Sequence, residues 1–404
     1  MKKLTLFSVL CSALLADGIS SFMPDITLTV DTAYVNRNKS DDTVSHLEIP
    51  SVAHGMLGKH SHGAHEHASY NAKNGFNLNY GELGISSSVD PIFTLDAVFH
   101  FSEHDSEIEE LYFTSNVLGD GLRLKGGKFL SNFGYLNEHH HHAWDFADMP
   151  LVYEAFLGMH GLNDKGLQLQ YTLPTPFYLM AGVELLQGDN EGMFGYDSIS
   201  IEGKKVANAK KAPSLYVGYL KSSFDIGDTT LYGGVSYAKG SSRIDHSDDH
   251  DHPHAFSGDA ELYGVDFMLL HQLGSYSNIK WQNELLYRKL DGNSHSATKS
   301  TPVVKKQAGI YSQLTYKHDA SWAMGVRYDG IIKNSVYKNA SKSAQPSGLN
   351  RYSAMVEYSV SEFAKIRAQF NHDRSMFDDD KRVDVNSFIL QANFTIGAHG
   401  AHGF

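Results

Sequence analysis

Cysteine is nearly absent from this chain of 404 residues, and its single copy, Cys11, lies close to the N-terminus. Without further cysteine the chain forms no disulfides and no thiolate metal site, so any metal must be held by imidazole, carboxylate, carbonyl or water. The apolar stretch Leu4 to Leu15 is too short to cross a bilayer as a helix. The sequence therefore excludes disulfide-stabilised folds and gives no support to a helical membrane protein.

Positive charge is also scarce, with 34 Lys and Arg against 46 Asp and Glu, a formal net charge of -12. This balance argues against a nucleic-acid partner and favours the accumulation of cations near the protein. Proline is rare at 10 residues, whereas the chain holds 36 Gly, 22 Tyr and 22 Phe. Glycine and aromatic residues in this proportion are typical of membrane barrels, which conceal their apolar content in alternation.

The N-terminus has the features of an export signal. Lysines 2 and 3 precede the apolar stretch, and Ala16 is a suitable residue before a cleavage site. Leu10 precedes Cys11 where a lipoprotein signal needs a small residue. We expect a signal peptide at residues 1–16 and a mature domain at residues 17–404, without a lipid anchor.

Apolar residues then recur at every second position in segment after segment. The last segment has Phe388, Leu390 and Phe394 on one face and polar Gln391 and Asn393 on the other. Such alternation suits a strand with one face in lipid and one toward water. We predict sixteen strands, near residues 25–35, 75–89, 92–102, 107–115, 121–130, 166–173, 177–187, 213–224, 229–240, 259–272, 278–291, 305–318, 321–333, 350–360, 363–374 and 385–397.

Short and long connections alternate between these segments, as they do between the periplasmic turns and outer loops of outer-membrane barrels. The fold class predicted is all-β: a transmembrane antiparallel β-barrel of about 16 strands in the outer membrane of a Gram-negative bacterium. The longer connections, expected outside the cell, are residues 36–74, 131–165, 188–212, 241–258, 292–304 and 334–349. The sequence leaves open whether 36–74 folds inward to constrict a pore.

Charged residues on the faces opposite the apolar ones are expected to point into an aqueous lumen. We predict that inward charges of both signs line the pore and set its selectivity: Glu184, Asp266, Glu284, Arg288, Arg327, Glu357 and Arg367.

Histidine is the second unusual feature, because fifteen of its 23 copies fall in three of the expected outer loops. Neutral imidazole beside carboxylate is a ligand set for zinc, nickel or copper. The candidate metal ligands are His60, His62, His65, His67, Glu138, His139, His140, His141, His142, Asp145, His246, His250, His252 and His254. The alternative is that these clusters are an incidental feature of polar surface loops.

Residues 126–137, which read GGKFLSNFGYLN, run into the histidine cluster and then AWDFADMP at 143–150. With GLNDKGLQL at 161–169 and GVELLQG at 182–188, this stretch resembles a family of small proteobacterial outer-membrane barrels described as zinc-regulated outer-membrane receptors. The resemblance covers residues 126–192 well and implies a role in uptake of zinc or a related metal. Such proteins are often labelled TonB-dependent, yet strand character from about Asp25 leaves too few residues for a folded plug, so we do not expect energy coupling.

The sequence therefore predicts a porin-like protein for divalent transition-metal ions, with His-, Asp- and Glu-rich outer loops that capture the ion above the pore. No permanently bound cofactor is expected, and zinc or another divalent metal is the transported or loop-bound ion. A general or anion-preferring porin is the alternative. No motif has catalytic spacing, so an enzyme is not expected. The expected partners are outer-membrane lipid and metal ions, and the sequence leaves open whether the barrel forms a homotrimer.

Overall fold

The computed structural model describes residues 23–54, 59–62, 65–68, 70–103, 106–115, 118–190, 192–247 and 253–397, with the backbone alone at 59–62 and 65–68. The expected signal peptide and the candidate ligands His250 and His252 lie outside the described residues.

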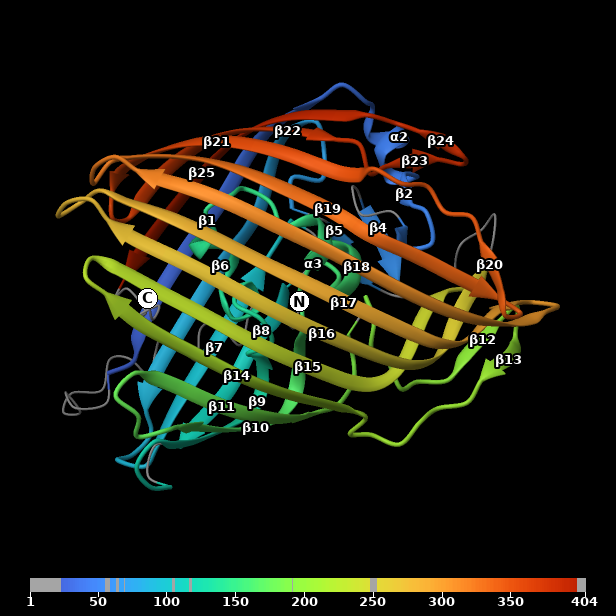
Figure 1. Ribbon diagram of the computed structural model, residues 1–404, viewed down its shortest axis with the longest axis horizontal. Helices are drawn as coiled ribbons and strands as arrows, with labels where there is room; N and C mark the ends of the chain where they lie inside the picture. The colour runs from blue at the N-terminus through green and yellow to red at the C-terminus, as the bar shows by residue number, and fades with distance from the viewer. Residues whose placement is uncertain are drawn as a thin grey trace, which may run out of the picture.

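Sixteen antiparallel strands close into a barrel within this part of the chain (Figure 1). Each strand pairs with the next barrel strand in the sequence, and the first pairs with the last, Thr27 opposite Gly397, which closes the ring. The predicted fold class is confirmed. The strands are β1 (Asp25–Arg37), β6 (Gly75–Ser88), β7 (Phe93–Phe101), β8 (Ser106–Ser115), β9 (Leu122–Leu130), β10 (Asn163–Thr172), β11 (Tyr178–Leu186), β14 (Leu215–Ile226), β15 (Thr229–His246), β16 (His254–Gln272), β17 (Asn278–Ser296), β18 (Ser300–Lys317), β19 (Trp322–Lys338), β21 (Leu349–Ser361), β22 (Ala364–Asp373) and β25 (Val385–Gly397).

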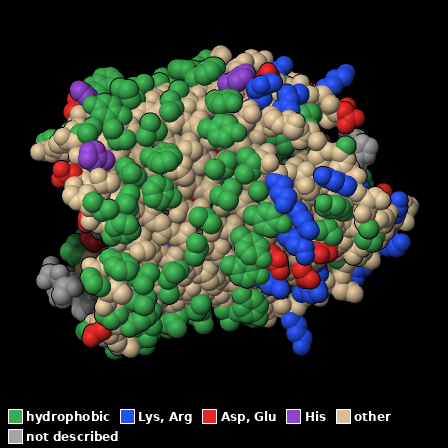
Figure 2. All heavy atoms as spheres, viewed as in Figure 1, with side chains coloured by type: hydrophobic (Ala, Val, Ile, Leu, Met, Phe, Trp, Pro, Cys, Tyr) green, Lys and Arg blue, Asp and Glu red, His purple; other side chains and the backbone are tan. Residues whose placement is uncertain are grey.

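Closure leaves the sixteen described barrel strands without an open sheet edge, so their backbone groups have partners without help from lipid. The outward face carries exposed apolar side chains such as Trp322 and Val326, while Arg327, which follows Val326, is buried inside. Figure 2 shows apolar side chains spread over most of the outer wall, with Lys and Arg gathered toward one end and Asp and Glu at both ends. No helix of the described residues is long and apolar enough to cross a membrane.

The two ends of the barrel differ. Short turns such as Gly227–Asp228 join strands at the turn end, near both termini of the described chain. The longer connections lie at the other end, called here the loop end. Three of them are shorter than expected, since β15 continues to His246, β17 to Ser296 and β19 to Lys338. The parts of these strands beyond the membrane do not contact lipid, so they need no alternating apolar residues. The strand pairing therefore continues past the point where the alternation in the sequence stops.

The loop after β9 folds into the barrel rather than outward. It contains the 3₁₀ turns η1 (Leu136–Glu138) and η2 (His141–Ala143) and the helix α3 (Leu151–Leu157), which Figure 1 shows within the ring of strands. Asp329 of β19 accepts a hydrogen bond from the Leu151 amide at 2.9 Å, which satisfies one of the donors left open at the start of α3. Gly158, at φ 81°, ends the helix.

The loop after β1 also enters the barrel mouth. It contains α2 (Asp41–Ser45), β2 (Glu48–Ile49), β3 (Ala53–His54), β4 (Lys59–His62) and β5 (His65–Ala68). The turn between β2 and β3 presents three successive carbonyls to the barrel wall, and the hairpin also pairs with β23 (Phe377–Asp378), which pairs with β24 (Lys381–Arg382). Two loops therefore occupy the interior. The remaining short strands are β12 (Ile199–Ile201), β13 (Lys204–Ala207) and β20 (Ser341–Ser343).

Candidate metal site inside the barrel

Three neighbouring strands each place an ionisable side chain on the same patch of the inner wall. Glu82 of β6 lies opposite His100 of β7 in the ladder. On β8 the register shifts, so that Glu109 is an extra residue between Ile108 and Glu110. A bulge of this kind redirects side chains. Glu109 and Glu110 are both buried inside, while Ile108 and Leu111 remain exposed outside.

A fourth side chain, His140, reaches this patch from the inward loop, between η1 and η2. Its position is set by contacts of the surrounding backbone with distant strands. Glu284 of β17 accepts hydrogen bonds from the amides of Tyr135 and Leu136, both at 2.9 Å. Lys365 of β22 donates to the carbonyl of His142. The loop is therefore held on both sides of His140.

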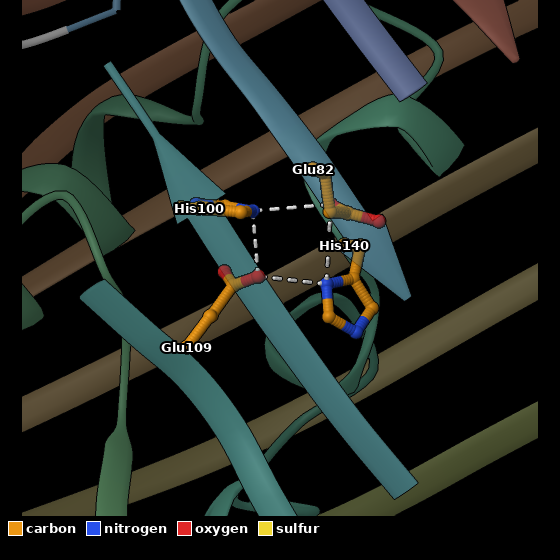
Figure 3. A group of neighbouring side chains, drawn as sticks. All are labelled: Glu82, His100, Glu109 and His140. Atoms are coloured by element: carbon orange, nitrogen blue, oxygen red, sulfur yellow. Dashed lines mark hydrogen bonds and ion pairs between the residues drawn. The ribbon is translucent and has the colours of Figure 1, made fainter. Parts of the chain in front are cut away.

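The four side chains converge on one point, as Figure 3 shows. One ligand atom from each of Glu82, His100, Glu109 and His140 lies within 4.8 Å of the others. The Nε2 atom of His100 is 3.1 Å from Glu82 Oε2 and 2.7 Å from Glu109 Oε2. The Nδ1 atom of His140 is 3.1 Å from Glu109 Oε2 and 3.8 Å from Glu82 Oε2.

Further groups surround these four. The second ring nitrogen of His140, Nε2, is 2.9 Å from Glu110 Oε2, and His142 Nδ1 is 3.4 Å from Glu82 Oε1. A carboxylate on the outer nitrogen of a ligating histidine orients the ring and fixes its tautomer. Glu110 is therefore placed as the orienting partner of His140.

A cavity of about 20 Å³ adjoins the cluster and is lined by Glu109, His140, His141, Trp144 and His160, among others. That space is enough for about one water molecule. Within the part of the chain that the structure describes, the buried Nδ1 atom of His141 has no hydrogen-bond partner. The His141 ring packs against Tyr70 at 3.9 Å and Trp144 at 4.2 Å between ring centres.

The loop histidines have contrasting environments. Burial lowers the pKa of His141 well below its usual value and also lowers that of His139, which favours neutral imidazole at both. At His140 burial acts in the same direction, but Glu109 and Glu110 outweigh it and raise the pKa well above its usual value. Without a metal, a proton on His140 therefore balances part of the negative charge of Glu109 and Glu110.

Two imidazoles and two carboxylates form a donor set that suits a divalent first-row transition metal. Such an ion would take the place of the protons between the side chains, since ligating histidine must be neutral. The donor set and its convergence fit a metal. The ion itself would supply no chemistry beyond its charge and coordination, as expected for a transported or captured ion.

The other predicted metal ligands are distributed among several places. Glu138 pairs with Lys221 at 2.7 Å and Asp145 with Lys280 at 2.7 Å, so both hold the loop. His139, His141 and His142 flank the cavity or the cluster. His246 and His254 face each other at the loop end, and the β4–β5 ladder pairs His60 with His67 and His62 with His65.

The predicted pore-lining residues all lie on the inner wall, and all but Glu357 are almost fully buried. Their partners are mostly groups of the inward loops. Glu184 accepts from the Ser131 hydroxyl at 2.6 Å, and Arg288 donates to the Ala155 and Val52 carbonyls at 3.2 and 2.7 Å. Arg327 pairs with Asp148, and Arg367 donates to the Trp144 carbonyl and pairs with Glu357. Asp266 is the exception, because neither of its carboxylate oxygens has a hydrogen-bond partner among the described residues.

Sequence reasoning missed Glu82, His100, Glu109 and Glu110, because it sought ligands in loops. One signal was available: Ile108-Glu109-Glu110-Leu111 sets two charged residues side by side in a strand that otherwise alternates. Such a break is typical of a bulge. The pairing of Glu82 with His100 depends on register, which their sequence positions do not show.

A protein of Aquifex aeolicus (strain VF5), described as an uncharacterized protein, is 45% identical to this chain over 385 residues, which cover 95% of this chain and 80% of the relative. The chain belongs to the family of that protein. No family model matches the sequence.

Among solved structures, OprB of Pseudomonas putida aligns with 96% of this chain and 97% of its own length, at 10% identity and a TM-score of 0.51. In-vitro folded OmpT, an outer membrane protein of Vibrio cholerae, aligns with 95% of this chain and 99% of its own length, at 11% identity and a TM-score of 0.51. The outer membrane channel DcaP of Acinetobacter baumannii aligns with 93% of this chain and 97% of its own length, at 12% identity and a TM-score of 0.50. These likenesses show the fold alone: a porin-like barrel of the outer-membrane type.

Proposed function

We propose that this barrel admits divalent transition-metal ions across the outer membrane, with zinc as the first ion to test. The observation that supports the proposal is the convergence of Glu82, His100, Glu109 and His140 inside the lumen. The resemblance of residues 126–192 to zinc-regulated receptors makes zinc the first choice. We expect a channel rather than an enzyme.

The interior supports selective rather than general passage. Residues 131–162 enter the lumen and bring His140 to the wall, so a solute passing on this side meets the cluster. A second cavity of about 50 Å³, lined by Arg37, Asp148, Glu154 and Arg351 among others, shares Met149 with the cavity beside the cluster. Tyr70 lines this second cavity and contacts His141, which lines the first.

Transport requires that the ion leave as well as bind, so a site for passage must exchange its ligands. Carboxylates suit this role because, when the ion leaves, they can again pair with the imidazoles that they contact in the metal-free protein. His100 and His140 each lie within 3.1 Å of Glu109. The metal-free cluster is therefore internally compensated, and release does not leave bare buried charges.

The test is zinc entry into liposomes that contain the purified barrel and a trapped zinc-sensitive dye. We expect saturable zinc entry that the double variant Glu109→Gln/His140→Ala loses. The matched control Glu261→Gln/His318→Ala also removes one carboxylate and one imidazole, but from the outer wall and the turn end, and should behave as wild type. Equal, unsaturable entry of zinc and small anions through all three proteins would instead indicate a general or anion-preferring porin.

A further inference from the structure

The loop end of the barrel brings together three histidines from two regions that are far apart in the sequence. His54 ends β3, His246 ends β15 and His254 begins β16. The ring centres of His246 and His254 are 5.0 Å apart, and those of His54 and His246 are 6.1 Å apart. We propose that these three side chains form a second transition-metal site at the rim of the barrel, distinct from the buried cluster.

The barrel wall itself places two of the three ligands. His246 and His254 are directly opposite each other in the last pair of the β15–β16 ladder. Directly opposed residues have their Cβ atoms about 4.5–5.5 Å apart, which is close enough for both rings to share an ion. A cross-strand pair in a barrel ladder has fixed spacing, unlike two histidines in a free loop.

The third ligand is fixed by the hairpin that enters the mouth. Arg288, Gln307 and Asn334 donate hydrogen bonds to the carbonyls of Val52, Ser51 and Pro50 at 2.7, 2.9 and 2.9 Å. These three bonds hold the turn that directly precedes Ala53 and His54. His54 therefore reaches the β15–β16 ladder on a segment anchored to three other strands.

The spacing of the rings suits one shared ion. Zinc–nitrogen bonds of about 2.0–2.1 Å in a tetrahedral site put neighbouring ring centres roughly 5 Å apart. The observed 5.0 and 6.1 Å are near that value, so small side-chain rotations suffice. Glu48 Oε2 lies 3.8 Å from His54 Nδ1, where it can orient that ring or complete the ligand set.

The two sites differ in ligand chemistry and access. The rim ligands are imidazoles, and His54 is exposed, with 41% of its side chain accessible. The inner cluster pairs imidazole with carboxylate, and the side chains of Glu82, His100 and Glu109 are at most 7% accessible. An imidazole-rich rim selects zinc, nickel or copper over magnesium and calcium before the ion reaches the carboxylates. Only this last role, as an entry station, rests on the proposed transport function; binding at the rim does not.

The test is residue-by-residue footprinting with diethylpyrocarbonate, which modifies accessible imidazole nitrogens that hold no metal, followed by mass spectrometry. We expect zinc to protect His54, His246 and His254 together, with one half-protection concentration. His246→Ala should raise that concentration for His54 and His254 at least about tenfold. His318, at the turn end, serves as the internal control and should keep its reactivity.

The same footprint in the Glu109→Gln/His140→Ala background separates the two proposals. Joint protection of the rim histidines there, whatever the zinc flux, supports the rim site. Unchanged reactivity of the three, or protection of each at a different zinc concentration, overturns it. Joint protection combined with absence of zinc flux through the wild type would overturn the transport proposal and leave the rim site standing.

Discussion

Two walls of the barrel interior use buried charge in opposite ways. On β17 to β22 the charged side chains form ion pairs or hydrogen bonds with the inward loop: Arg327 pairs with Asp148, and Arg351 donates a hydrogen bond to the Met149 carbonyl. On β6 to β8 the carboxylates of Glu82, Glu109 and Glu110 each contact a histidine, and Glu110 also accepts a hydrogen bond from the Leu130 amide. Buried charge with a fixed partner holds structure, whereas buried charge compensated by titratable groups needs protons or a cation. The first wall anchors the loop, and the second presents a site.

The largest effect is expected on the anchoring wall. Arg327→Met removes the guanidinium that lies 2.7 Å from half-buried Asp148 and 2.8 Å from buried Asp329, and leaves them the longer ion pairs with Arg351, at 3.6 and 3.7 Å. Loss of one partner of a buried pair costs about 3–5 kcal/mol. The free energy of unfolding, from urea titration in lipid, should fall by that amount. Lys342→Met, at an exposed site, is the control and should change it by less than about 0.5 kcal/mol. Equal behaviour of the two variants would remove the distinction between the walls.

On the site wall, removal of ligands should lower metal affinity. Glu109→Gln/His140→Ala removes two of the four converging groups. Calorimetric titration should show zinc affinity at this site lowered at least about 100-fold, equivalent to about 2.7 kcal/mol. The Glu261→Gln/His318→Ala control should bind as wild type does. A double variant that kept full affinity would show that the cluster is another anchor.

The anchoring wall should also respond to pH through Glu154 of α3. Burial raises its pKa to about 7, against the opposing effect of Arg351 at 3.7 Å. Because the folded pKa is raised, its contribution to stability is complete below about 4.5 and is lost as the pH rises through 7. Between about pH 5 and about pH 8 the unfolding free energy should fall by about 2 kcal/mol more in wild type than in Glu154→Gln. Parallel pH profiles for the two proteins would contradict this.

The smallest effect distinguishes ligands from the group that orients them. Glu110→Gln keeps all four converging ligands but weakens the carboxylate contact to His140 Nε2, now 2.9 Å. Loss of an orienting partner lowers metal affinity about tenfold or more. Zinc titration should place this variant between wild type and the double ligand variant. An affinity as low as that of the double variant would make Glu110 a ligand itself.

The barrel was predictable because lipid imposes a period of two on every strand, as in Trp322 to Tyr328. Strand ends at the loop end were not, since no lipid acts there, and for that reason His246 and His254 were expected in a loop rather than opposite each other. His140 was found through composition. Its partners on β6 to β8 depend on register, on a bulge and on an inward-folded loop, which arise from long-range packing that no local pattern records.

The most direct test of the account is a crystal structure of the wild-type barrel grown with zinc, with anomalous diffraction collected above and below the zinc absorption edge. We predict an anomalous peak within about 2.0–2.2 Å of ligand atoms of Glu82, His100, Glu109 and His140. Zinc peaks confined to surface histidines, with the four inner side chains still bonded to one another, would contradict it.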